Sequence, residues 1–458
     1  MIQLDTSLQP KSLETRVHRL FELSAARLKA FAESWNLSQG APVFTVRGIY
    51  TPCEWTDWTR GFLFGSSLLQ FDATGEAWFL EYARNNIPTQ MARYVSHVGV
   101  HDHGFNIVST FGNLLRLSKE SKFEAQPWER EYSALALKVS GAIQAARWTR
   151  LADGRGFIYS FSGPHSLFAD TMRSLRSLAL AHQLGHALLG EGDRRISLLQ
   201  RLAGHASVTA DYAVYYGEGR DQYDVRGRVA HESIFNIQDG SYRCPATQQG
   251  YSPFTTWMRG LAWALLGFAE ELEFLRTVEG AIEAPGGGAP IEAAMLRAAE
   301  ATADYYLEQT PWDGVPFWDS GAPNLKNLGD CLNRPSDPFN DLEPVDSSAA
   351  AIAAQGLWRL GTYLLGSQQL DQANRYRQAA LVIARTLFDE PYLAVNPAHQ
   401  GLILHSVYHR PKRWDYVPPG RKIPCGEASM WGDYHARELA LLLLREIGRE
   451  PYLVFYNL

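Results

Sequence analysis

Six segments of this chain are apolar on nearly every face of the helix that each would form, and this pattern constrains the fold most. Each begins with a small, polar or acidic residue and continues as a mostly apolar helix: 58–70, 104–117, 170–185, 254–272, 346–360 and 432–447. A helix that is apolar all round is a buried helix. Amphipathic segments lie between them, for example 191–213 and 367–387. Six buried helices alternating with six amphipathic ones predict an all-α chain folded as an (α/α)6 toroid, a six-hairpin barrel.

The pattern runs through the chain without a dividing linker, so we expect a single domain over residues 1–458. Strand-like alternation is sparse, with one candidate at 156–160. The Gly- and Pro-rich stretch 284–290 is interpreted as a flexible surface loop between two helices. An irregular helical array is the alternative architecture. In a toroid we expect the functional residues in the loops at one mouth of the ring.

Charge and composition exclude several classes of protein. Hydrophobic residues make up 46% and charged residues 20%, which excludes a disordered chain, a collagen and a coiled coil. The formal charge of −6 supplies no basic face, so no nucleic-acid partner is expected. No apolar run is long enough to span a bilayer, and the first residues do not have the pattern of a signal peptide.

The cysteines indicate the cellular compartment, and the aromatic residues indicate the kind of binding site. Four cysteines lie far apart without a CxxC pair, which favours a reducing compartment and a cytoplasmic protein. We expect a monomer or a small homo-oligomer. Aromatic residues make up 12% of the chain and include 13 Trp. Such a content is typical of a site with flat walls for a sugar, although a Trp-rich core would explain it equally well.

Two acidic residues stand where buried helices begin. Asp102 lies in HDHGF (101–105) and Asp170 in FADTM (168–172). Either could simply cap its helix. If both point into the central cavity, their pKa values separate, and a carboxylate pair of this kind performs glycoside chemistry. His101 and His103 also allow a metal interpretation, but a chelating site needs three or four ligands and no further partner stands nearby, so no metal is expected.

A third constellation combines aromatic residues with one arginine. Arg259 and Trp263 share a helix face, and Trp257 and Gln249 precede them. Arg259 suits a carboxylate ligand, and within a buried helix its charge needs a partner. Either Trp could stack on a sugar, and core packing is the alternative. Trp58 begins the first buried segment. The basic, Pro-rich stretch 409–422 is interpreted as a solvated loop, or alternatively as a loop that overhangs the mouth and binds an anionic group of a substrate.

These motifs together resemble the unsaturated glucuronyl hydrolases, glycoside hydrolase family 88. The resemblance rests on their order along the chain: WTRGFLFG (58–65), HDHGF (101–105), DTM (170–172), QGYSPFTTWMRGLAWALLGFA (249–269), VPFWDSGAP (315–323), VDSSAAAIAAQGL (345–357) and WGDYHARE (431–438). It implies an (α/α)6 barrel whose catalytic domain removes a 4,5-unsaturated uronic acid from the non-reducing end of lyase-generated oligosaccharides. The reaction is hydration of the C4=C5 double bond and needs no cofactor.

The resemblance also assigns residues. Asp170 matches the family's acid/base aspartate and Asp102 its second essential aspartate. We expect an ionised Asp102 to raise the pKa of Asp170, which donates the proton. The remaining positions match residues of the sugar site: Trp58, His101, His231, Gln249, Trp257, Arg259 and Trp263. Arg259 would orient the uronate carboxylate.

Two positions depart from the family. His103 replaces an aliphatic residue. Arg173, one helical turn after Asp170, stands where the family commonly has Met, and it could depress the pKa of the acid, bind a further anionic group or point away. The alternatives to the glucuronyl activity are an unsaturated galacturonyl hydrolase, an ordinary glycosidase and a sugar-binding toroid without activity.

Overall fold

A computed structural model describes residues 1–458 except 54–56, 279–281 and 283–287. Most of the loop expected at 284–290 therefore lies outside the described residues. Among the described residues, helices dominate and all strands are short.

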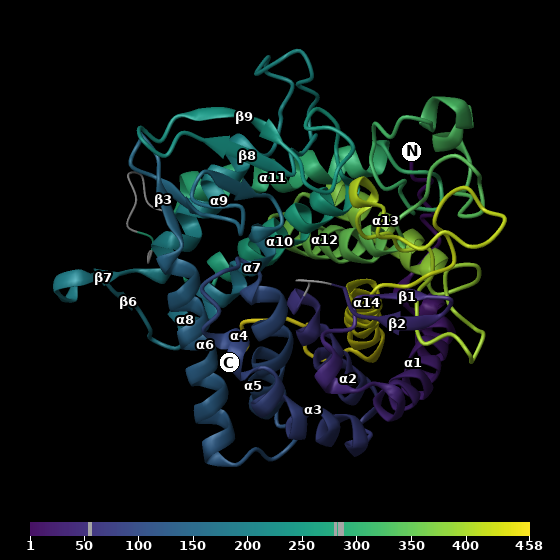
Figure 1. The fold of residues 1–458 in the computed structure, drawn as a ribbon, viewed down its shortest axis with the longest axis horizontal. Helices are drawn as coiled ribbons and strands as arrows, with labels where there is room; N and C mark the ends of the chain where they lie inside the picture. Colours follow the sequence, from purple (N-terminus) through teal and green to yellow (C-terminus); the bar gives the residue numbers. More distant parts are fainter. Residues whose placement is uncertain (54–56, 279–281, 283–287) are drawn as a thin grey trace.

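The six apolar segments form an inner ring of helices (Figure 1). Neighbouring members contact one another in chain order, and the last packs against the first, which closes the ring. The members are α2 (Arg60–Thr74), η4 with α5 (Gly104–Gly112 and Asn113–Lys119), α7 with α8 (Thr171–Ser174 and Arg176–Gln183), α10 (Met258–Leu275), α12 (Ser347–Gly366) and α14 (Met430–Gly448).

An outer helix packs beside each inner member. The outer helices are α3 (Ala77–Gln90), α6 (Pro127–Ala146), α9 (Leu198–Tyr212), α11 (Ala289–Glu308), α13 (Leu370–Leu387) and α1 (Glu14–Ser34), the last of which covers α14. The fold is thus the expected (α/α)6 toroid. A short helix, α4 (Ala92–Val95), continues from α3.

The strands form four small antiparallel sheets. Three are hairpins: β1 (Phe44–Val46) with β2 (Ile49–Thr51), β3 (Trp148–Arg150) with β4 (Gly156–Ile158), and β6 (Leu188–Leu189) with β7 (Arg195–Ile196). The fourth has three strands, in the order β5 (Ser166–Phe168), β8 (Glu232–Phe235) and β9 (Tyr242–Ala246). β4 confirms the strand expected at 156–160.

The helix expected over 191–213 is wrong in its first part. Gly192 and Asp193 adopt positive φ values of 65° and 57°, so the chain turns back on itself between β6 and β7. The helix α9 begins only after Ser197, whose hydroxyl accepts a hydrogen bond from the backbone nitrogen of Gln200. Likewise α13 begins at Leu370, after a turn at Gln368. The polar residues at the starts of the two segments expected as helices, 191–213 and 367–387, therefore belong to turns.

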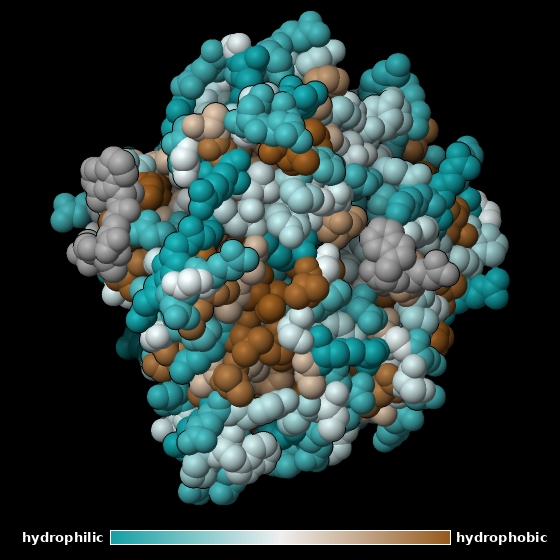
Figure 2. All heavy atoms as spheres, turned by 60° about the vertical axis from the view of Figure 1, so that its left-hand side comes forward, coloured by the Kyte–Doolittle hydropathy of each residue, from teal (hydrophilic) through white to brown (hydrophobic). Residues whose placement is uncertain are grey.

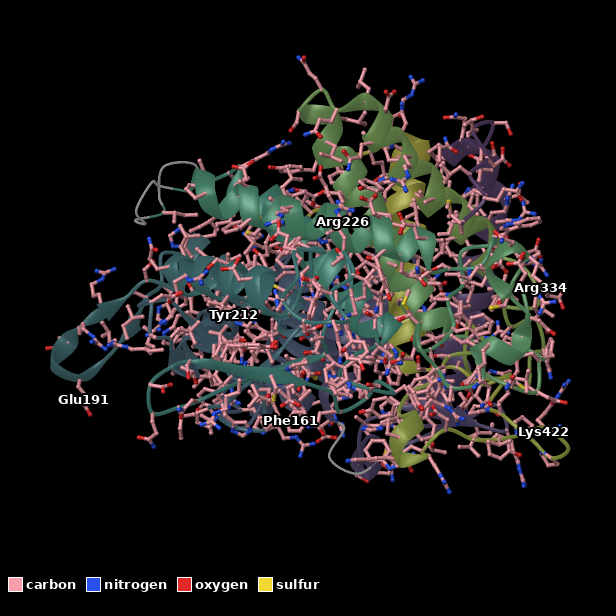
Figure 3. The ribbon with its side chains drawn as sticks, turned by 90° about the horizontal axis from the view of Figure 1, so that it is seen from above. Phe161, Glu191, Tyr212, Arg226, Arg334 and Lys422 are labelled. Atoms are coloured by element: carbon pink, nitrogen blue, oxygen red, sulfur yellow. The ribbon has the colours of Figure 1, made fainter. Side chains whose placement is uncertain are left out.

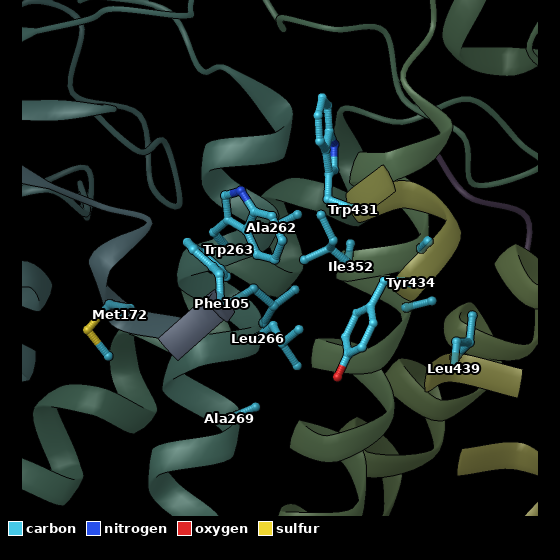
Figure 4. Packing of buried hydrophobic residues seen from close by; sticks show 14 of the residues in the cluster. Phe105, Met172, Ala262, Trp263, Leu266, Ala269, Ile352, Trp431, Tyr434 and Leu439 are labelled. Carbon is cyan, nitrogen blue, oxygen red and sulfur yellow. The ribbon is translucent and has the colours of Figure 1, made fainter. Parts of the chain in front are cut away.

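Inner helices pack closely where the two aspartates stand. A Cβ added at Gly104 would lie 2.3 Å from the Cα of Ser174, and one at Gly267 would lie 2.6 Å from the carbonyl carbon of Met172. Glycine thus lets η4 and α10 approach the backbone of α7. Below this level, large apolar side chains fill the ring, as Figure 4 shows for Phe105, Trp263 and Tyr434. On the face shown in Figure 2, hydrophilic residues surround a hydrophobic area below its centre, and smaller hydrophobic areas are scattered among them.

Candidate active site

A cavity of about 420 Å³ opens at the mouth of the ring where the inner helices begin. This volume is typical of a small-ligand site. Eight of the nine predicted site residues line it: Trp58, His101, Asp102, Asp170, Gln249, Trp257, Arg259 and Trp263. The sequence therefore located the mouth correctly.

The two aspartates meet at one histidine. The Nε2 atom of His101 lies 3.2 Å from Oδ1 of Asp170 and 3.5 Å from Oδ1 of Asp102. All three side chains are largely buried. Asp102 lies two residues before η4, and Asp170 lies directly before α7. Gly104 allows these two elements to pack closely. The structure thus brings the carboxylates into one cluster with an imidazole between them.

The sequence predicted a raised pKa for Asp170 beside an ionised Asp102. The structure gives the reverse order, with the pKa of Asp102 raised and that of Asp170 lowered. Burial raises the pKa of Asp102, and the nearby charge of Asp170 adds to this. Burial acts in the same direction on Asp170, but the hydrogen bond and charge of His101, with the charges of His231 and Arg259, lower its pKa below the usual value. Burial opposes the charged form of His101, yet Asp102 and Asp170 outweigh it and raise the pKa of that imidazole. The expectation missed His101, whose positive charge stabilises an ionised Asp170.

His231 is the predicted residue that stands behind the cavity wall. It lies directly before β8, the middle strand of the three-stranded sheet, and its carbonyl oxygen accepts a hydrogen bond from the backbone nitrogen of Ala169. Its Nε2 atom is 3.9 Å from Oδ2 of Asp170, while its Nδ1 atom accepts from the backbone nitrogens of Gln248 and Gln249. His231 therefore links Asp170 to the turn that carries Gln249.

Tryptophan side chains form the apolar walls. Trp58 stacks on Trp431 with ring centroids 5.1 Å apart, and its Nε1 atom donates to the Tyr408 hydroxyl. Trp263 packs against Phe105, with centroids 4.8 Å apart. Trp257 and Trp263 are nearly buried, as core packing predicts, and both also line the cavity. Their stacking on a sugar stays a prediction.

The two terminal nitrogens of Arg259 donate within the protein, and the expectation that this residue orients a uronate stays a prediction. Its Nη1 atom donates to Asp346 and to the carbonyl oxygen of Val407, and its Nη2 atom donates to Tyr408 O and to Gln249 Oε1. The buried charge of Arg259 forms an ion pair with Asp346. Because Gln249 accepts through its oxygen, its amide nitrogen remains as a donor on the cavity wall.

The two departures from the family pattern lie away from the cavity. Arg173 is fully buried and pairs with Glu270 and Glu438, each at 2.8 Å, deeper in the ring. Of the three possibilities considered from the sequence, the structure shows the last: Arg173 points away from the cavity. His103 bonds through Nδ1 to Ser140 and through Nε2 to the carbonyl oxygen of His97, and burial lowers its pKa to about 4. It is a neutral packing residue.

The loop 409–422 reaches the site, so its interpretation as a merely solvated loop is wrong. His409, Lys412 and Trp414 line the cavity, next to Tyr408. The basic and aromatic composition of this loop was the sequence feature that could have predicted its contact with the cavity. Phe161 was missed entirely: its ring stacks on His101 with centroids 5.9 Å apart, and it lies near the molecular surface (Figure 3). A single Phe in a loop gives no pattern from which to predict this contact.

Two further properties concern the described residues alone. No group of three or more His, Cys, Asp or Glu side chains among them is arranged to hold a metal ion. None of the described helices combines the length and apolarity needed to cross a membrane.

Comparison with known proteins points to one group. No family model matches the chain. An unsaturated glucuronyl hydrolase of Bacillus sp. (strain GL1) is 26% identical over 93% of this chain and 95% of the relative. One of Formosa agariphila is 24% identical over 83% of this chain and 78% of the relative. An unsaturated chondroitin disaccharide hydrolase of Streptococcus agalactiae is 22% identical, with 88% and 85% covered.

Solved structures agree on the fold. The crystal structure of the Bacillus sp. GL1 enzyme superposes with a TM-score of 0.68 at 21% identity, over 95% of this chain and 97% of the other. A crystal structure of an unsaturated glucuronyl hydrolase specific for heparin superposes with a TM-score of 0.67 at 18% identity, over 95% and 98%. The chain is thus similar in sequence to the unsaturated glucuronyl hydrolases over most of its length, and it shares their fold.

Proposed function

We propose that this protein is a glycoside hydrolase that removes a 4,5-unsaturated glucuronic acid from the non-reducing end of lyase-generated oligosaccharides. The observation that carries the proposal is the cluster of Asp102, His101 and Asp170 in a cavity with tryptophan walls. Curated relatives that cover nearly the whole chain are named unsaturated glucuronyl hydrolases. A carboxylate pair with a stored proton is what hydration of an enol ether requires.

The chemistry adds water across C4=C5. A proton is transferred to C4, which leaves an oxocarbenium-like centre at C5, and a water oxygen bonds to C5. The resulting hemiketal opens and releases the partner sugar. We assign Asp170 as the carboxyl that delivers the proton and then accepts one from water, and Asp102 as the group that stabilises the positive centre.

His101 explains how Asp170 obtains its proton despite a lowered pKa. The imidazolium donates through Nε2 to Asp170 Oδ1, so the proton lies one hydrogen bond from the acid. A uronate carboxylate bound nearby adds negative charge, and this raises the affinity of Asp170 for that proton. Gln249, held by Arg259, directs its amide nitrogen to the sugar.

An ultraviolet assay tests the proposal. Unsaturated disaccharides lose the absorbance of their conjugated double bond when water is added. We expect the protein to remove this absorbance and Asp170→Asn to lower kcat at least 100-fold while disaccharide binding persists, in line with the loss of an acid/base group. Asp193→Asn, an exposed aspartate outside the cavity, is the control.

The same assay separates the alternatives. Faster loss of absorbance with galacturonyl than with glucuronyl substrates would replace the proposed specificity. Activity on saturated glycosides alone would identify an ordinary glycosidase, and binding without turnover would identify an inactive sugar-binding toroid. The thiols of Cys244, Cys331 and Cys425 are free, which supports action in a reducing compartment, and we propose the cytoplasm.

A further inference from the structure

The imidazole of His101 has a hydrogen bond on one of its two nitrogens. Its Nε2 atom lies 3.2 Å from Asp170 Oδ1, whereas its Nδ1 atom is buried and has no hydrogen-bond partner among the described residues. The second nitrogen of a functional histidine commonly donates to a carbonyl or carboxylate oxygen, and this bond fixes the orientation of the ring. For His101, a contact of another kind must hold the ring and support its charge.

Two phenylalanine rings enclose this imidazole. Phe161 lies nearly parallel to the ring of His101, with centroids 5.9 Å apart and an angle of 22° between the planes. Phe168 lies nearly perpendicular to the same imidazole, at 5.2 Å and 76°, and the two phenylalanine rings are 5.4 Å apart. A cation within about 6 Å of an aromatic ring is attracted by the negative charge of the ring's face. Phe161 therefore presents its face to the charged imidazole.

The turn between β4 and β5 fixes the position of Phe161. The carbonyl oxygen of the buried Ser160 accepts a hydrogen bond from the backbone nitrogen of Gly163. The φ of Gly163 is 121°, which glycine adopts readily. The Nη2 atom of Arg147 donates to the carbonyl oxygens of Tyr159 and Ser160. The backbone on both sides of Phe161 is thus braced, although the residue itself is 43% exposed.

The titratable groups around His101 come from several elements. Asp102 and Asp170 raise its pKa, while burial and the charge of Arg147 lower it. Three further imidazoles lie within range of its charge, those of His103, His205 and His231. Burial lowers the pKa of these three to about 4, about 3 and about 4, so they are neutral where His101 titrates. Besides the two aspartates, the aromatic enclosure therefore favours the charged imidazole, and Phe161 is the exposed member of that enclosure.

We propose that Phe161 is a positioning residue for the reaction: its ring, stacked on the imidazole of His101, stabilises that imidazole in its charged form and holds Nε2 toward Asp170. The aromatic face takes the place of the hydrogen bond that Nδ1 lacks. Phe161 acts through the histidine, since it has no polar group of its own. The proposal rests on the hydrolase activity proposed above, in which His101 supplies the proton of Asp170.

Replacement of Phe161 by leucine removes the aromatic face and keeps an apolar side chain over the imidazole. We expect the pKa of His101 to fall by about half a unit to one unit in Phe161→Leu. The proton is then lost at lower pH, so the alkaline decline of kcat should begin earlier by the same amount. Below this decline, kcat and KM should stay near the parent values.

Two further variants serve as controls. Phe161→Tyr retains the aromatic face and should keep the parent profile. Phe254→Leu should also keep it, because Phe254 is 41% exposed and stacks on Tyr223 but lies outside the cavity lining. Circular dichroism checks that every variant is folded.

Nuclear magnetic resonance separates this proposal from the proposed function. In protein with isotope-labelled histidine, the His101 signal is the one that is missing from His101→Gln, and its titration midpoint is measured without substrate. A parent that hydrolyses no unsaturated disaccharide would refute the function, and the midpoints would still decide whether Phe161 supports the charge of His101. Equal midpoints in the parent and Phe161→Leu would overturn the proposal. A raised KM with an unchanged alkaline decline would also overturn it and would indicate that Phe161 packs on the sugar.

Discussion

At the scale of single residues, the chemistry depends on where protons and charges reside. His101 lies close to both aspartates; burial raises the pKa of Asp102, whereas the hydrogen bond and charge of His101 outweigh burial at Asp170 and lower its pKa. Arg259 and Arg173 show how a buried charge is satisfied by partners distant in sequence, Asp346 for the first and Glu270 with Glu438 for the second. The motif residues are thus held by partners that lie far apart in the chain.

The role of His101 predicts a pH dependence. Its folded-state pKa lies above the usual 6.5, so the proton for Asp170 is available below that raised value and is lost as the pH rises through it. We expect kcat of the parent to fall on the alkaline side. In His101→Gln this limb should disappear, with kcat reduced about 10- to 100-fold. Measuring kcat against pH with the unsaturated disaccharide checks this.

His186→Gln, at a half-buried histidine outside the cavity lining, serves as the control and should retain the parent profile. An unchanged alkaline limb in His101→Gln would show that another group supplies the proton.

At the scale of elements, glycines set the separation of the helices that carry the cluster. The segment η4 has π-helical hydrogen bonding over Gly104–Gly112, a feature that often accompanies functional sites. Its first residue touches the backbone of α7, which no side chain other than hydrogen would allow. Two helix starts are therefore held at a spacing at which one imidazole bridges their aspartates.

Gly104→Ala should disturb this spacing. The new Cβ would lie 2.3 Å from Ser174 Cα, so η4 and α7 must separate, and we expect a loss of about 1–3 kcal/mol in the free energy of unfolding. Activity should fall further than stability, because His101 and Asp102 move with η4. Urea denaturation and the ultraviolet assay measure the two effects.

Gly112→Ala is the matched variant in the same element. Its nearest neighbour is the side-chain atom Cγ1 of Val108 at 3.2 Å, which can shift. If both substitutions had equal effects on activity, the close approach at Gly104 would not position the site.

At the scale of the whole molecule, the ring separates two buried polar regions. The mouth holds the cluster of Asp102, His101 and Asp170, and the deeper part holds the ion pairs of Arg173. Arg173 connects three members of the inner ring, since it comes from α7 while Glu270 belongs to α10 and Glu438 to α14. These pairs support the ring across its axis.

Arg173→Met therefore tests stability apart from chemistry. The substitution removes the arginine paired with the buried Glu438 and leaves Glu270 with only its longer ion pairs to Arg176 and Arg359. Removing one member of a buried pair costs about 3–5 kcal/mol. We expect a lower Tm, with kcat near the parent value at temperatures where the variant is folded. Thermal denaturation followed by circular dichroism measures the first, and a greatly reduced kcat in the folded variant would instead place Arg173 in the reaction.

Arg16→Met is a control, because its ion pair with Asp389 is exposed and such pairs contribute about 0–1 kcal/mol. A Tm shift as large as that of Arg173→Met would contradict the importance of burial.

The sequence by itself determined the ring and the position of its mouth. Six helices without a polar face must be buried together, whatever their partners, and the residues at their starts must then meet. Trp58, Asp102, Asp170 and the block from Gln249 to Trp263 could be placed in the cavity on that ground.

Only the tertiary structure decided which groups pair. The bridging by His101, the partners of Arg259 and Arg173, and the approach of loop 409–422 to the cavity all join segments far apart in the chain. The hairpin of β6 and β7 was hidden because residues 191–197 have a composition that also suits a helix. Helix burial follows from local periodicity, whereas electrostatic pairing and pKa order depend on distances across the ring that local pattern does not contain.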